Sequence, residues 1–405
     1  MRAFAGGFYG NLKALYDHLG VRYRTQHFLF EFAKPQSGPS QGRGRSNVSY
    51  FVHASNMHQP PPRPISLGII AYVVEAVYLL ACYAWFSICC FMIAPERGET
   101  LQHYLQRTWV SQRFVTSYLL PLISSVTTCP HASLLGFPAS DVIEYKRKTH
   151  RAPHYTVSDG VREVQDRLLQ EIPCEFSATV TCVNPFEKGV RVSWKKGSEA
   201  QMTTELFDRV VIAVSPDVVG HIFAPLQHHM SRIPVAVVES VVHTDQSVLH
   251  KGAVAFDTDK HGAQLIYLHT TTEDVHKTAS HHVQPCGPIV TTCPLTPISP
   301  AFAIRSAKFT RVLRNPESQR IVNAIFENFP PACADEKHMP PWRNGDNNVW
   351  LAGGWCWDGM VLLEGCVVSA MRVADDFGVN VPWRCPKKNY AYCRNIEVDT
   401  PRYSL

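Results

Sequence analysis

One short segment near the carboxyl end limits the possible folds more than any other, because it reads as a strand, a glycine turn and a helix in succession. Residues 349–352 are apolar and lead into Gly353 and Gly354, and a pattern of small and apolar residues at helical spacing follows over 364–377. Paired glycines let a ligand approach the backbone, and the N–H groups at a helix start attract anionic or electron-rich groups. The segment predicts either a ligand-binding turn or an ordinary strand–turn–helix unit.

The composition is that of a folded protein with a large core. The 405 residues are 45% hydrophobic and 18% charged, which suggests two domains or one large interleaved unit. The net charge of +5 is spread along the chain, and the densest basic run, residues 146–148, is typical of a solvated surface. No nucleic-acid partner is predicted.

The 13 cysteines do not form a disulfide or zinc framework, because no CxxC pair occurs and several cysteines lie inside apolar runs. A reducing compartment and no metal site are therefore expected. His243 and Asp245 are separated by one residue, which suggests a catalytic pair. They lie in a strand-rich region, however, and a structural role is favoured for both. No G-x-S-x-G elbow occurs, which argues against a hydrolase.

Residues 65–94 form the most apolar stretch, and from Ala76 to Ala94 no charged residue occurs. This length is sufficient for a membrane helix, and a buried core helix is the alternative. A single crossing would place residues 1–60 and 100–405 on opposite sides of a bilayer. If those two parts pack together, the segment must instead dip in and return or lie on the surface. We expect a membrane-associated protein that faces the cytoplasm and contacts the membrane through 65–94.

Local patterns predict further elements. Helices are expected over 8–20, 160–170 and about 315–328, with two more within 99–125. A hairpin is expected over 174–194, a parallel strand covered on both faces over 208–214, and strands of another sheet over 235–242 and 252–256. Residues 34–64 read as a flexible connection, 284–300 as a loop and the chain from 382 as a loose tail.

The segment 348–378 resembles the C-terminal flavin-binding motif of the flavin-containing amine oxidase superfamily. The match lies in Leu-Ala-Gly at 351–353, which ends the strand, and in Glu-Gly-Cys at 364–366, which starts the helix. In that superfamily the helix start faces the flavin ring and ribityl chain. By resemblance, the FAD contacts in this segment are Gly353, Gly354, Glu364 and Gly365.

Two other blocks are similar to the same superfamily. Residues 157–216 resemble its middle flavin-domain segment, in which Val180 matches the position whose backbone touches the adenine and Ser215 lies in the loop after the last strand. Residues 8–21 resemble the stretch just after its first flavin segment. Together the blocks indicate the NAD/FAD-binding, amine-oxidase-like oxidoreductases of uncertain substrate, and they cover most of 4–378 apart from the apolar insertion.

The chain departs from this superfamily at its start. The G-x-G-x-x-G turn that binds the pyrophosphate lies upstream of the first block in the family, and no strand is predicted before the glycine-rich residues 5–10 here. We expect a flavin domain truncated at its N-terminus. The sequence is then an incomplete product of its gene, a chain completed by another chain, or a degenerate relative that holds flavin weakly or not at all.

The expected fold is α/β, with an FAD/NAD(P)-binding Rossmann-like domain built from discontinuous segments and an α+β substrate domain. The segments, in chain order, are 1–33 (start of the substrate domain and flavin-domain edge), 34–98 (linker and apolar helix), 99–156 (helical substrate-domain part), 157–220 (middle flavin segment), 221–340 (substrate-domain sheet and helix), 341–380 (C-terminal flavin segment) and 381–405 (tail).

The resemblance implies an FAD-dependent oxidoreductase that removes hydride from a small or lipid-like substrate, such as a secondary metabolite. The cofactor would carry the chemistry, and no catalytic residue can be assigned from the sequence. The alternative is a catalytically inactive, membrane-associated truncated relative or partner subunit.

Overall fold

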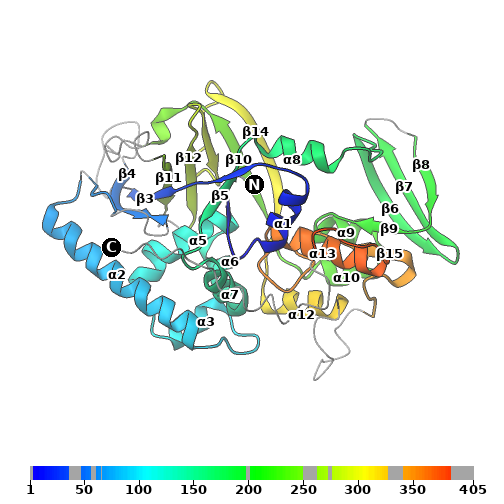
Figure 1. Cartoon of the computed structure of the whole chain (residues 1–405), viewed down its shortest axis with the longest axis horizontal. Coiled ribbons are helices and arrows are strands. Elements are labelled where there is room, and N and C mark those ends of the chain that lie inside the picture. Colours follow the sequence, from blue (N-terminus) through cyan, green and yellow to red (C-terminus); the bar gives the residue numbers. More distant parts are fainter. Residues whose placement is uncertain are drawn as a thin grey trace.

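A seven-stranded mixed sheet dominates one half of the molecule (Figure 1). The computed structural model describes residues 3–35, 47–55, 61–64, 66–197, 201–249, 262–271, 276–326 and 341–384. All neighbouring strands of the sheet are antiparallel except β3 and β11, which are parallel. In spatial order the strands are β14 (Ala303–Val312), β10 (Val235–His243), β13 (Ile289–Thr292), β12 (Thr278–Val283), β11 (Gln264–Thr270), β3 (Phe28–Pro35) and β4 (Asn47–Ala54).

Helices bury one face of this sheet. Phe32 and Leu268 alternate along their strands with residues of the opposite face, and they pack in one core with Tyr104, Phe114 and Ile143 of the helices. The helices are α2 (Ile69–Met92), α3 (Leu101–Arg107), α4 (Gln112–Phe114), α5 (Leu120–Thr127), α6 (His131–Leu135) and α7 (Ala139–Thr149).

A π-helical turn, Val115–Leu119, joins α4 to α5 and has a local cause. Pro121 has no N–H group, so the carbonyl of Ser117 four residues earlier loses its helical partner. The Tyr50 hydroxyl from β4 donates to that carbonyl at 2.5 Å. A side chain of the sheet therefore replaces the missing helical bond and fixes this helix against β4.

The other half of the molecule contains two parallel strands, β9 (Val210–Ile212) and β15 (Val349–Leu351). They pack with α9 (Pro216–Ile222), α10 (Gln227–Met230) and α12 (Pro316–Ile325) in a second core. An antiparallel sheet of β6 (Ala178–Phe186), β7 (Gly189–Lys196) and β8 (Thr203–Phe207) projects at the right of Figure 1 and joins this core through Val183 and Val190.

The two ends of the described chain meet in a third core. Phe4, Leu12 and Tyr16 from the N-terminal end pack there with Val367 and Met371 from the C-terminal end. The elements are α1 (Gly10–His18), α8 (Val161–Leu168), α13 (Leu363–Asp376) and a small antiparallel sheet of β1 (Phe4–Ala5), β5 (His154–Val157) and β2 (Tyr23–Thr25).

The helices predicted at both chain ends, in the apolar stretch and near 160–170 and 315–328 are confirmed, as are the β6–β7 hairpin and the parallel strand β9. Three predictions are wrong. β4 lies inside the connection expected over 34–64, β13 lies inside the loop expected over 284–300, and β9 is not covered on both faces, since Val211 is 42% exposed. The strand predicted over 252–256 lies outside the described residues.

The glycine-rich residues 5–10 also differ from expectation, because the two-residue strand β1 precedes them. β1 is antiparallel to β5 and belongs to the small sheet, so it does not supply a parallel strand next to β9. Gly7 has φ +78°, and a Cβ there would lie 2.2 Å from the Lys148 carbonyl oxygen. Close packing against α7 therefore explains this glycine.

Candidate functional site

The candidate site lies at the carboxyl ends of β9 and β15. Because the strands are parallel, the loops that follow them, residues 213–215 and 352–354, emerge at the same edge of the sheet. The indole N–H of Trp355 donates to the Val214 carbonyl at 3.0 Å and ties the two loops together. Ligands of α/β folds bind in crevices outside such carboxyl ends.

The glycine turn after β15 is held tightly against α13. Gly353 has φ +151°, a conformation that favours glycine, and its N–H donates to the Ser369 hydroxyl at 2.9 Å. That hydroxyl lies 2.7 Å from the Gly365 carbonyl, to which it donates. A Cβ on Gly354 would lie 3.0 Å from the Leu362 carbonyl oxygen. The turn and the helix start are therefore one rigid unit.

Gly365 and Gly359 both make room for the ring of Trp357. A Cβ on Gly365 would lie 2.5 Å from that ring and 2.6 Å from the Gly354 carbonyl oxygen, and one on Gly359 would lie 2.6 Å from the ring. Close packing accounts for both glycines without a ligand. The FAD contact predicted at Gly365 stays a prediction.

Glu364 is buried and caps α1. One carboxylate oxygen accepts from the Asn11 backbone N–H at 2.9 Å and from the Asn11 side-chain amide at 2.8 Å, and the other accepts from the Leu12 N–H at 3.0 Å. A carboxylate at a helix N-terminus satisfies free donors and interacts favourably with the helix dipole. The residue chosen by resemblance as an FAD contact thus joins the two ends of the chain.

The structure brings Ser215 to the same edge as Gly353 and Gly354. Ser215 occupies the N-cap position of α9, its side chain makes no capping bond, and it is half-buried. Val180 lies on β6 and is 37% exposed, whereas Val183 on the same strand packs into the core that includes α9. Val180 therefore lies on the neighbouring sheet, opposite Trp194 of β7, and its predicted contact with the adenine stays a prediction.

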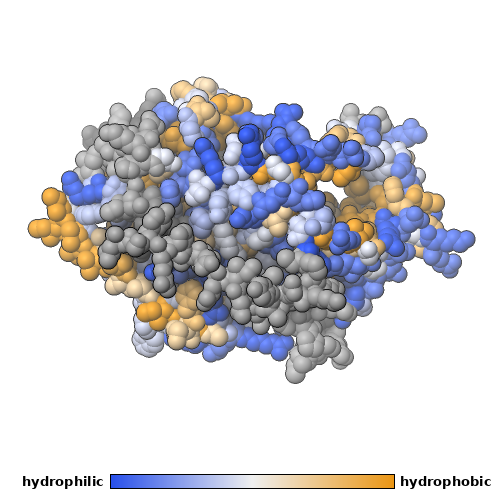
Figure 2. Space-filling view, in the orientation of Figure 1, coloured by the Kyte–Doolittle hydropathy of each residue, from blue (hydrophilic) through white to orange (hydrophobic). Residues whose placement is uncertain are grey.

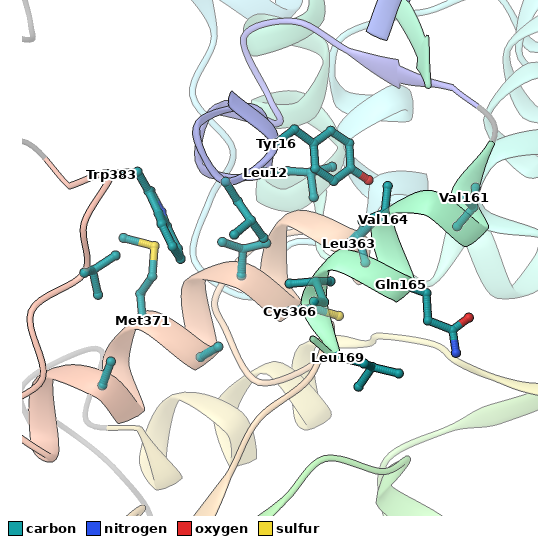
Figure 3. Close-up of a pocket in the computed structure, with 16 residues that line it drawn as sticks. Leu12, Tyr16, Val161, Val164, Gln165, Leu169, Leu363, Cys366, Met371 and Trp383 are labelled. Atoms are coloured by element: carbon teal, nitrogen blue, oxygen red, sulfur yellow. The ribbon is translucent and has the colours of Figure 1, made fainter. Parts of the chain in front are cut away.

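An apolar cavity of about 630 Å³ lies between α1, α8 and α13 (Figure 3). The small residues of α13 have two different environments. Cys366, Ala370 and Ala374 line this cavity, whereas Ser369 is hydrogen-bonded to the glycine turn. Among the described residues, no charged side chain lines the cavity. Larger side chains complete the lining, including Leu12, Tyr16, Val164, Leu168 and Met371.

Arg314 holds the segment that follows the glycine turn, and nothing in the sequence singled this residue out. Its guanidinium is buried and donates to the carbonyls of Trp357 at 2.7 Å and Trp355 at 2.8 Å. Asp141 of α7 lies 3.8 Å away, and burial raises the pKa of this carboxyl to about 6, with Arg314 opposing that shift. A single arginine just after a strand gives no sequence signal of such a role.

The side chains near the turn offer little acid–base chemistry. Burial raises the pKa of the thiols of Cys356 and Cys366, which keeps both protonated and weakly nucleophilic. Within the described part of the chain, no group of three His, Cys, Asp or Glu side chains could hold a metal ion. The turn and the helix start therefore supply packing and hydrogen bonds rather than an acid, a base or a nucleophile.

Comparisons with known proteins agree with this architecture. No family model and no curated protein sequence matches the chain. Among solved structures, the chain is similar to a CLA-producing fatty acid isomerase from P. acnes, with a TM-score of 0.54, 10% identity and coverage of 94% of this chain and 86% of that one. It is similar to a double mutant of putrescine oxidase, with a TM-score of 0.52, 11% identity and coverage of 93% and 87%.

A cyclohexylamine oxidase from Brevibacterium oxydans IH-35A aligns with a TM-score of 0.47 and 13% identity. Structural similarity at 10–11% sequence identity establishes the fold of the chain but not its reaction. The likeness extends over nearly the whole chain and includes both halves of the molecule. The chain has an amine-oxidase-like fold.

Proposed function

We propose that the chain is an FAD-dependent oxidoreductase of the amine-oxidase-like type, acting on a small or lipid-like substrate. One observation carries the proposal: two parallel strands end at the same edge, and the second of them, β15, leads into a glycine turn that is hydrogen-bonded to α13. This is the edge where α/β folds bind ligands. The amine-oxidase-like fold supports it, since FAD is the cofactor that the resemblance implies. FAD, when bound, would accept the hydride from the substrate.

The residues present fit this cofactor in part. Val211 is 42% and Val214 is 39% exposed, so the carboxyl end of β9 is open to solvent beside Ser215. The indole of Trp355, which follows the glycine turn, donates to the Val214 carbonyl and keeps the two loops adjacent. These loops would line one side of the cofactor and exclude water from it.

Glu364 and Gly365 would act differently from the contacts implied by resemblance. The Glu364 carboxylate already accepts three hydrogen bonds from Asn11 and Leu12, and Gly365 is pressed against Trp357. Both residues would therefore hold the glycine turn in place through contacts within the protein, without touching the cofactor. The Rossmann-like organisation remains part of the same proposal.

The test is the absorption spectrum of the purified full chain and of one variant that blocks the carboxyl end of β9. Ala213 is exposed there, so Ala213→Phe adds a large side chain at this edge without disturbing the core. We expect flavin absorbance in the wild type and at least a tenfold loss of bound flavin in the variant, at an unchanged melting temperature. Val218→Phe, at a 38% exposed position on α9, is the matched control and keeps the flavin.

A colourless, folded wild-type protein that takes up no added FAD would contradict the proposal. That result would favour the non-catalytic alternative, a relative that keeps the fold and has lost the cofactor. Flavin retained by Ala213→Phe would place the cofactor away from β9.

A further inference from the structure

We propose that α2 lies in the plane of a membrane surface and that its outward face contacts lipid. The helix has 24 residues and a length of about 36 Å, and among the described residues it is the helix long and apolar enough to cross a membrane. Only 11% of its most apolar window is buried, so it is not a core helix. Figure 2 shows hydrophobic residues at the left end of the molecule, where Figure 1 places α2.

The packing of the chain excludes a simple crossing. β3 and β4 precede α2, and α3 to α7 follow it, yet all contribute to one core with the inner face of α2. Leu79, Phe86 and Cys90 are buried in that core. A crossing would pull these two groups of elements to opposite sides of the bilayer, so the helix must lie along the surface.

The outward face of α2 carries no charge. The single charged residue of the helix, Glu75, is turned inward, where it pairs with Arg113 at 2.5 Å and accepts from the Tyr118 hydroxyl. The Glu75 side chain is 13% exposed. The one residue that would oppose insertion is thus held away from the outward face.

This uncharged face is wide. At about 100° per residue, the exposed positions from Ile69 to Trp85 span about 160° of the helix circumference. A partner helix in a coiled coil uses only a narrow seam, whereas a fluid hydrocarbon surface covers a broad arc. The exposed apolar residues are Ile69, Ile70, Val73, Val74, Val77, Leu80, Trp85, Ile88, Phe91 and Met92.

Aromatic and basic residues border the face as they do at membrane interfaces. Trp109 is 87% exposed with φ +55°, a conformation that costs energy for a bulky residue, and it follows Thr108, whose carbonyl accepts from the Trp85 indole. Arg63 and Arg97 are exposed just outside the two ends of α2. Indole rings favour the headgroup region, and arginines complement lipid phosphates.

The experiment is flotation of the full chain with vesicles of phosphatidylcholine, alone and mixed with phosphatidylserine. The wild type should float with both kinds of vesicle and be released by an alkaline carbonate wash, as expected for a helix that does not cross. Val74→Glu combined with Ile88→Glu should reduce bound protein at least tenfold at an unchanged melting temperature. Gln102→Glu combined with Gln106→Glu, at exposed positions of α3, adds the same charge and should float like the wild type.

Four results would overturn the proposal. The first three are a wild type that is not detected with either vesicle, a Val74 and Ile88 variant that floats as well as the wild type, and bound protein that resists the carbonate wash. A wild-type dimer that the same variant converts to a monomer would instead assign the face to a second copy of the chain. None of these outcomes depends on whether the protein binds FAD.

Discussion

At the scale of single residues, buried polar groups organise the candidate site. Asp141 is almost fully buried, and its oxygen Oδ1 accepts from Gln319 at 2.9 Å. Arg314 lies 3.8 Å from the other oxygen, but it directs its N–H groups to the carbonyls of Trp355 and Trp357. Burial therefore prevails over the ion pair and raises the pKa of Asp141 to about 6.

This shift predicts a specific dependence of stability on pH. The pKa of Asp141 in the folded state lies above its ordinary value of 3.8, so the folded protein holds this proton more tightly. The associated stability is complete below pH 3.8 and is lost as the pH rises to about 6. The wild type should lose up to about 3 kcal/mol in the free energy of unfolding over this pH interval, and Asp141→Asn should not show this loss.

Urea unfolding at several pH values across that interval measures the effect. Asp166→Asn, at an exposed position of α8, is the control and should follow the wild type. Equal pH slopes for Asp141→Asn and the wild type would contradict the assignment.

At the scale of elements, the sequence predicts what is local and apolar. Helices α1, α2, α8, α12 and α13 have clear periodicity, and the β6–β7 hairpin has an alternating pattern and a short turn. β14 was not predicted, because it is mostly exposed and carries Arg305 and Lys308. Its sequence therefore lacks the alternation of apolar and polar residues that indicates a half-buried strand. β4 was missed because it lies in a region rich in Pro, Gly and Ser.

The candidate site was predictable to a similar degree. Gly353, Gly354 and Ser215 were chosen by resemblance, and the structure brings their loops to one edge of the β9–β15 pair, while their contact with FAD stays a prediction. The role of Glu364 could not be found, because its partners Asn11 and Leu12 are more than 350 residues away in sequence. Only the folded chain brings the carboxylate to the start of α1.

The cap on α1 predicts a large effect for a small change. Glu364→Ala leaves the N–H groups of Asn11 and Leu12 without their buried acceptor, so we expect a loss of about 2 to 3 kcal/mol in the free energy of unfolding. Chemical denaturation measures the loss, and Glu163→Ala on the surface of α8 should change stability by less than about 0.5 kcal/mol. A loss no larger than that of Glu163→Ala would show that the cap is not needed.

At the scale of the whole molecule, Arg314 connects the parts. It follows β14 of the large sheet, contacts Asp141 of α7, and holds the turn between β15 and α13. The side chain is 2% exposed, so its five donors depend on protein acceptors. Its removal would take the donor from two buried carbonyls and the nearby positive charge from the Asp141 carboxyl.

We therefore expect Arg314→Ala to destabilise the protein by about 3 to 5 kcal/mol. Equilibrium urea unfolding followed by circular dichroism measures this loss. Arg162→Ala, whose side chain is 91% exposed on α8, should be nearly neutral. A nearly neutral Arg314→Ala would mean that the turn is held by other contacts.

The bond between Glu364 and the start of α1 joins residues 353 positions apart, which has a consequence for synthesis. While the protein grows on the ribosome, α1 lacks this acceptor and its apolar neighbours on α13 until residues 363–376 have emerged. Completion of the third core is thus postponed until long after α1 itself has been synthesised.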